Sequence, residues 1–348
     1  HDLDEPELIV IFYANRLNKR FDMNKLSINQ PDAIKEENRL MHFPISMFSI
    51  VMGLSGFSIV WQKSLGTLFP WLTTFTSGLA SAAMILISGL YLLKLIRYPN
   101  AVITETKHPI KINFFAAFSI SLLLLSIVWH SFESLSYTLW GIGAIVQLSI
   151  TLWAMHSWIH HDHYRLEHAN PSWFIPVVGN IIAPITGAKL GFIEISWFFF
   201  SIGIVFWLVL FTIIINRLIF HAVLPARFKP MLFILLAPPS IGFISYSSLV
   251  PELTIFSRVL ASVALFIATL LLLNINQFRK GGFYLSSWAF SFPVAAFNIA
   301  LLRYAELTQS TVSLYLGRTL LAGLTLLILW LLWNTFKAIK AGEICQPE

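Results

Sequence analysis

Long apolar stretches set the strongest limit on how this chain can fold. A helix needs about 20 apolar residues to cross the hydrocarbon core of a bilayer, and stretches of about this length fill most of the sequence. Charged residues make up 11% of the 348 residues, against about 25% in an ordinary soluble domain. We predict an all-α polytopic membrane protein with ten transmembrane helices, at 43–62, 71–95, 111–129, 136–156, 172–190, 193–217, 228–249, 252–274, 283–302 and 311–337.

The remaining sequence is short and polar. Residues 1–42 mix acids with bases around an apolar run that is too short for a secretory signal, so we predict a cytoplasmic or added N-terminal segment. Residues 43–337 form one transmembrane channel domain in this interpretation, and 338–348 form a C-terminal cytoplasmic tail. These divisions leave no room for a soluble catalytic domain, so we expect no enzyme. The lone cysteine, Cys345, excludes an intrachain disulfide.

The placement of Lys and Arg predicts the orientation. Cytoplasmic loops carry an excess of these residues, and 23 occur in the chain. Most lie in the terminal segments or after even-numbered stretches, so both termini should be cytoplasmic. The exceptions are Lys63, Lys189, Arg258, Arg303 and Arg318. The connections after odd-numbered stretches also hold acids, which we interpret as solvated loop charges: Glu133, Glu194, Glu252 and Glu306.

Proline divides the stretches into two classes. The prolines inside stretches all fall on odd-numbered ones: Pro44, Pro176, Pro184, Pro230, Pro238, Pro239 and Pro293. Even-numbered stretches carry smooth aliphatic runs instead. Five hairpins, each with an inner odd and an outer even member, would give two concentric layers around a central pore, because backbone groups freed by proline are tolerated in protein or beside water. The alternative is that prolines and small residues merely help helices to pack.

Several residues on odd-numbered stretches are candidates for the pore. Pro293 cannot donate to the carbonyl of Ala289, so a helix there should kink and free an acceptor. The candidate kinks are Pro44, Pro184, Pro238 and Pro293. The candidate lining residues are Ser49, Gly53, Asn180, Ser291, Phe48, Phe118 and Phe243.

Four motifs resemble one known family: "FPISMFSIVMGLSGFSIVW", "NPSWFIPVVGNIIAP", "LAPPSIGF" and "SSWAFSFPVAAFNIALLRYA". They are similar to the tellurite-resistance/dicarboxylate transporter family, which includes the plant guard-cell slow anion channels, over about residues 43–337. The resemblance implies five helical hairpins around a quasi-fivefold pore and a homotrimer with one pore per protomer. It also implies a bacterial inner membrane location, a link to tellurite resistance, and a phenylalanine plug at Phe292.

The central parts of the stretches contain no Asp or Glu, so no carboxylate ring that selects cations is expected. We therefore expect a channel for small monovalent inorganic anions such as chloride and nitrate, gated by Phe292. The alternative is a secondary transporter that exports dicarboxylates or tellurium oxyanions. Such carriers usually place ionisable residues at the midplane, which these stretches lack.

A histidine-rich segment suggests a third class, a metal-dependent membrane enzyme. Its histidines could be metal ligands: His156, His160, His161, His163 and His168. Di-iron membrane enzymes need several such clusters, however, and the other histidines are scattered. We interpret this segment as a cytoplasmic interfacial loop. No metal, cofactor or nucleic-acid partner is expected, and the expected surroundings are membrane lipid and other copies of the chain.

Overall fold

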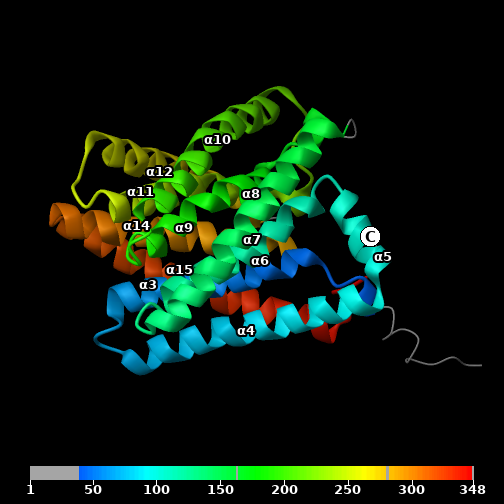
Figure 1. Ribbon diagram of the computed structural model, residues 1–348, viewed down its shortest axis with the longest axis horizontal. Helices are drawn as coiled ribbons and strands as arrows, with labels where there is room; N and C mark the ends of the chain where they lie inside the picture. The colour runs from blue at the N-terminus through cyan, green and yellow to red at the C-terminus, as the bar shows by residue number, and fades with distance from the viewer. Residues whose placement is uncertain (1–38, 162–163, 280–281, 347–348) are drawn as a thin grey trace, which may run out of the picture.

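The computed structural model describes residues 39–161, 164–279 and 282–346, which are almost entirely helical (Figure 1). Nine segments in this described part are long and apolar enough to cross a membrane. The inner four are η2 and α3 (Ile45–Met47, Phe48–Leu65), η3 and α6 (Lys111–Phe115, Ala116–Val128), η7 and α11 (Ala226–Leu236, Ala237–Leu249), and η8 and α14 (Leu285–Phe290, Ser291–Thr308). The outer five are α4 (Pro70–Arg97), α7 (Glu133–His160), α10 (Ile193–Phe220), α12 (Ile255–Leu273) and α15 (Thr311–Lys340). The prediction of an all-α polytopic membrane protein is confirmed.

The remaining predicted stretch, 172–190, is not a continuous helix. It consists of four short pieces, namely η5 (Pro171–Trp173), α8 (Phe174–Val178), η6 (Gly179–Ile182) and α9 (Ala183–Gly187). Pro176 and Pro184 cannot donate backbone hydrogen bonds, and Gly179 lowers the helix propensity between them. The described residues therefore contain nine long helices and this broken segment, which is nevertheless buried over almost its whole length.

Side chains of the outer helix α7 satisfy backbone carbonyls of the broken segment. Gln147 Nε2 and Thr151 Oγ1 both donate to the carbonyl of Pro176, at 2.8 and 2.7 Å. Trp140 Nε1 donates to the carbonyl of Ala183 at 2.9 Å. An unpaired polar group is costly in a membrane interior, so these three side chains explain how the chain tolerates the break.

We expect Gln147→Leu to lower the free energy of unfolding by about 1–3 kcal/mol, the usual cost of an incompletely satisfied buried polar group. Gln147 is fully buried, and its Oε1 also accepts from Ser119 Oγ at 2.7 Å. Thermal or denaturant unfolding in detergent measures the change. The control is Ser149→Ala on the exposed face of α7, and an equal effect of the two substitutions would contradict this account.

The helices form two layers, as the proline pattern predicts. In the most apolar 18-residue window of each segment, 67–78% of residues are buried for the inner four and 22–33% for the outer five. Within the inner layer, α3 contacts α6 and α14, α11 contacts α9 and α14, and α6 contacts α9. The five inner segments therefore close into a ring. Figure 1 shows α4 on one side of the molecule, α10 and α12 on the other, and α6, α8 and α11 between them.

Each inner segment begins with a 3₁₀ turn before it becomes α-helical. Three of the four candidate kink prolines lie at these transitions, and Pro44 precedes the first 3₁₀ turn. Pro44 is the N-cap of η2, Pro184 and Pro238 are the second residues of α9 and α11, and Pro293 is the third residue of α14. The prolines therefore mark a change of helix type more than a bend within one helix.

A buried ion pair ties the inner layer to the short helix α5 (Pro99–Lys107). Lys94 Nζ of α4 lies 3.0 Å from Glu105 Oε1 and donates to the carbonyl of Phe43 at 2.8 Å. Tyr91 donates its hydroxyl to Glu105 Oε2 at 2.8 Å. The Lys94 side chain is only 1% exposed, so this cation is part of the packing between α4, α5 and the first inner segment.

Candidate functional site

Phe292 lies between two cavities on the inside of the ring of inner segments. The first, which we call the narrow cavity, has a volume of about 60 Å³. The second, which we call the vestibule, has a volume of about 530 Å³. Phe292 and Ile241 line both cavities, and the Phe292 side chain is 7% exposed. The phenyl ring therefore stands where the two cavities approach each other.

All five inner segments contribute to the narrow cavity, and its lining is almost entirely apolar. Ala289 and Pro293 are both part of this lining. Ala289, to whose carbonyl Pro293 cannot donate a hydrogen bond, therefore lies beside the cavity. Trp288 is fully buried in the wall and donates its Nε1 to Thr335 Oγ1 at 2.9 Å. The volume is enough for a few water molecules, since one requires about 10–15 Å³, but the wall offers them few polar partners.

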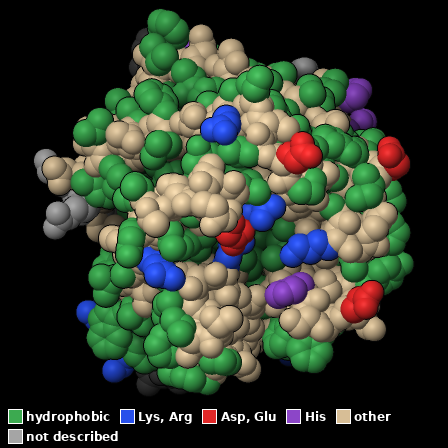
Figure 2. All heavy atoms as spheres, turned by 90° about the vertical axis from the view of Figure 1, so that its left-hand side faces the viewer, with side chains coloured by type: hydrophobic (Ala, Val, Ile, Leu, Met, Phe, Trp, Pro, Cys, Tyr) green, Lys and Arg blue, Asp and Glu red, His purple; other side chains and the backbone are tan. Residues whose placement is uncertain are grey.

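The vestibule has an aliphatic base and a polar rim. The five inner segments each supply an aliphatic side chain: Ile59, Leu124, Ile185, Ile244 and Ile299. The rim consists of Gln62, Lys63, His130, Lys189, Ser247, Ser248, Pro251 and Arg303. Figure 2 shows this end of the molecule, where Lys, Arg and His side chains gather around a central hollow.

The charges of the rim come from separate segments. Lys63 Nζ lies 2.6 Å from Glu306 Oε1, and Arg303 Nη1 lies 3.1 Å from Glu306 Oε2. Arg303 Nη2 also donates to the carbonyl of Ser247 at 3.4 Å. Lys189 lies in the turn after α9.

Some of the candidate kink and lining residues lie at these cavities. Ser49, Pro238 and Pro293 line the narrow cavity. The Ser49 hydroxyl donates to the carbonyl of Ser46 at 2.6 Å. Pro44 lines a different cavity, of about 840 Å³, which both ends of the described chain border. Pro184 is buried in α9.

Three other predicted lining residues lie in helix packing instead: Gly53 of α3, Asn180 of η6 and Ser291 of α14. A Cβ atom added at Gly53 would fall 2.7 Å from Ser291 Cβ, so this glycine permits close contact between α3 and α14. Ser291 Oγ donates to the carbonyl of Trp288 at 2.6 Å. Asn180 Nδ2 donates to Thr151 Oγ1 of the outer helix α7 at 2.8 Å. Asn180 thus connects η6 to α7, while Gly53 and Ser291 lie where α3 and α14 pack against each other.

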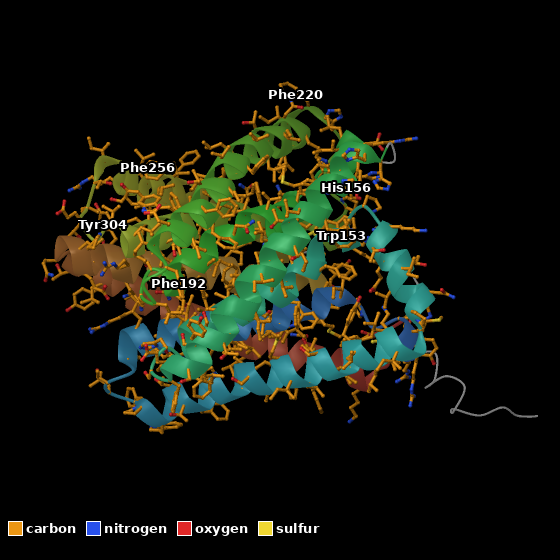
Figure 3. The ribbon with its side chains drawn as sticks, viewed as in Figure 1. Trp153, His156, Phe192, Phe220, Phe256 and Tyr304 are labelled. Atoms are coloured by element: carbon orange, nitrogen blue, oxygen red, sulfur yellow. The ribbon has the colours of Figure 1, made fainter. Side chains whose placement is uncertain are left out.

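The other predicted aromatic residues also pack against rings. Phe48 meets Phe118 edge to face, with ring centroids 5.3 Å apart. Phe243 is completely buried, and its ring centroid lies 6.1 Å from that of Tyr304. Tyr304 is labelled at one end of the molecule in Figure 3, with His156 at the opposite end.

The accessible positions can be tested with cysteine substitutions in a Cys345→Ser background. We expect Ile244→Cys in the vestibule to react with a small water-soluble thiol reagent, because Ile244 lines an open cavity. Asn180→Cys and Leu271→Cys should stay protected, since both side chains are buried in helix packing. The measurement is the labelling rate by mass spectrometry, and equal rates at all three positions would contradict the assignment of the cavity.

The histidine-rich segment does not form a metal centre within the described residues. The rings of His156 and His160 stack at 4.3 Å, and no group of three or more potential ligands occurs in the part of the chain that the structure covers. His163 lies outside the described residues.

Trp288 and Ile241 are wall residues that the sequence did not predict, because neither has a chemical signature. The sequence did contain a signal for the rim of the vestibule. Lys63, Lys189 and Arg303 are exceptions to the expected cytoplasmic distribution of basic residues, and the structure brings these three to one cavity.

Comparison with known proteins yields several relatives. The guard cell S-type anion channel SLAC1 of Arabidopsis thaliana is 28% identical over 86% of this chain and 57% of its own length. S-type anion channel SLAH3 of the same plant is 33% identical over 85% of this chain and 48% of its own length. The Tellurite resistance protein TehA homolog of Haemophilus influenzae is 26% identical over 73% of this chain and 78% of its own. The chain thus spans about half the length of the plant relatives.

The family profile described as "Voltage-dependent anion channel" matches residues 42–336. This match covers the inner and outer helices and both cavities beside Phe292. The chain belongs to the SLAC1 family.

Proposed function

We propose that this protein is a channel that conducts small monovalent anions through the vestibule and the narrow cavity, with Phe292 as the gate. The observation that carries the proposal is the position of Phe292, whose side chain lines both cavities inside a closed ring of five segments. The names of the family and of its plant and bacterial relatives support an anion as the transported species. The link to tellurite resistance rests on the bacterial relative alone.

A phenyl ring can close such a path without any charge. An apolar constriction loses its water, and an ion that gives up its hydration shell there meets a steep barrier because nothing replaces the lost contacts. The wall on one side of Phe292 is almost entirely apolar. The cations of the rim lie on the other side, where they would favour anions over cations.

The surroundings complete the proposal. Large apolar side chains are exposed along the outer helices, including Ile85, Ile145 and Leu326, and would face lipid. We place the protein in a bacterial inner membrane on the strength of the bacterial relative, with both termini in the cytoplasm because of the Lys and Arg distribution. The two ends of the described chain border one cavity, which supports their lying on the same side. A homotrimer with one path per protomer rests on the family resemblance.

Reversal potentials test the channel against the coupled transporter. Phe292→Ala protein is placed in a planar bilayer with a chloride gradient, and sodium and proton gradients are then added separately. For a channel, the reversal potential follows the chloride gradient alone. A reversal potential that moves with the sodium or proton gradient would identify a coupled carrier of anions instead.

A further inference from the structure

We propose that the rim of the vestibule is a weak binding site for a monovalent inorganic anion, and that the carboxylate of Glu306 sets its affinity. The cations of this site are Lys63, Lys189 and Arg303. The inference rests on the proposed function and deepens it, because it assigns the residues that hold an anion before it reaches Phe292.

The first support is the sign of the charges around the cavity. Lys63 comes from α3, Lys189 from the turn after α9, and Arg303 from α14. All three line the vestibule, and no Asp or Glu of the described residues does so. Like charges repel one another, so an arrangement of three cations around one cavity is stabilised by any anion that enters it.

The second support is the set of available hydrogen-bond donors. The hydroxyls of Ser247 and Ser248 donate to backbone carbonyls of their own helix, at 2.7 and 3.0 Å. The amide nitrogen of Gln62 donates to Ser77 Oγ and to the carbonyl of Val128. The ammonium and guanidinium groups are therefore the main donors that remain for an anion. Hydrogen bonds from such charged donors are stronger than those from neutral donors.

The third support is the position of Glu306. Its two carboxylate oxygens contact Lys63 and Arg303 separately, so it occupies the place of an oxyanion between two cations. Glu306 itself does not line the vestibule; it borders a neighbouring cavity with Lys63 and Arg318. It therefore compensates the two rim cations from outside the vestibule.

Lys189 differs from the other two cations, because no acid among the described residues lies within ion-pair distance of it. Its charge is the one that Glu306 does not compensate directly. A conducting site must bind its ion firmly enough for the ion to enter and weakly enough for it to leave. One carboxylate against three cations gives such an intermediate strength for a monovalent anion.

The test is the dependence of conductance on chloride concentration in the Phe292→Ala background, at low ionic strength where screening is weak. We expect Glu306→Gln to lower the half-saturating chloride concentration about two- to fivefold, the range of partly exposed ion pairs. Lys189→Gln should raise it by a similar factor. The matched control is Glu194→Gln, which removes an exposed acid at the same end of the molecule.

Chloride binding is also measured without conduction, by chlorine NMR line broadening of the purified variants in detergent. If Phe292→Ala conducts but Glu306→Gln behaves like Glu194→Gln in both measurements, the inference is wrong and the proposed function stands. If the protein binds chloride with the expected order of variants but never conducts, the site stands and the channel function is wrong. Melting temperatures establish that each variant is folded, and the opposite expected signs for Glu306 and Lys189 exclude a general loss of structure.

Discussion

Phe292→Ala is expected to raise chloride or nitrate conductance by orders of magnitude over the wild type. The substitution removes most of the ring between the vestibule and the narrow cavity, which leaves room for a continuous column of water. If the barrier from dewetting falls by several kcal/mol, the rate rises about tenfold for each 1.4 kcal/mol. The measurement is single-channel or macroscopic current in a planar bilayer or an oocyte.

Two further variants control for packing. Phe292→Leu should raise conductance less, because a leucine side chain still excludes water. Phe243→Ala truncates a phenylalanine of the inner layer that is fully buried and does not line either cavity. We expect it to cost about 3–5 kcal/mol of stability without opening the path. A well-folded Phe292→Ala protein that stays silent would disprove the gate, and one as unstable as Phe243→Ala would indicate an ordinary packing role.

Lys94→Met is expected to lower the free energy of unfolding by about 3–5 kcal/mol, the usual cost of removing one partner of a buried ion pair. The change leaves Glu105, which is 6% exposed, with the Tyr91 hydroxyl as its remaining side-chain partner among the described residues. It also removes the donor to the carbonyl of Phe43. Both α5 and the first inner segment should therefore be held less firmly against α4.

Denaturant unfolding in detergent measures this effect, with Lys107→Met on the exposed surface of α5 as the control. The double variant Lys94→Met/Glu105→Leu should be less destabilised than the sum of the two single variants, because no unpaired charge remains buried. Additive effects in this cycle would mean that the two side chains are not energetically coupled.

The sequence by itself determined the membrane class and the two layers of helices. The predicted stretches 193–217 and 252–274 correspond to Ile193–Phe220 and Ile255–Leu273. The length of an apolar stretch is a local property of the sequence, and the thickness of the bilayer sets the length that a spanning helix needs. The proline pattern similarly identified the inner layer, which the burial of the helices confirms. The break within 172–190 was implicit in its prolines, but its tolerance depended on three side chains of α7.

The tertiary structure alone decided which side chains face the cavities. Ser49 and Asn180 are both polar residues on odd-numbered stretches, so the sequence does not distinguish them. In the structure, Ser49 lines the narrow cavity, whereas Asn180 donates a hydrogen bond to Thr151 of α7. The rotation of each helix about its axis depends on its neighbours, and the sequence pattern of a helix buried on all sides contains little information about it. Lys63, Lys189 and Arg303 lie far apart along the chain and form one rim only because the inner segments close into a ring.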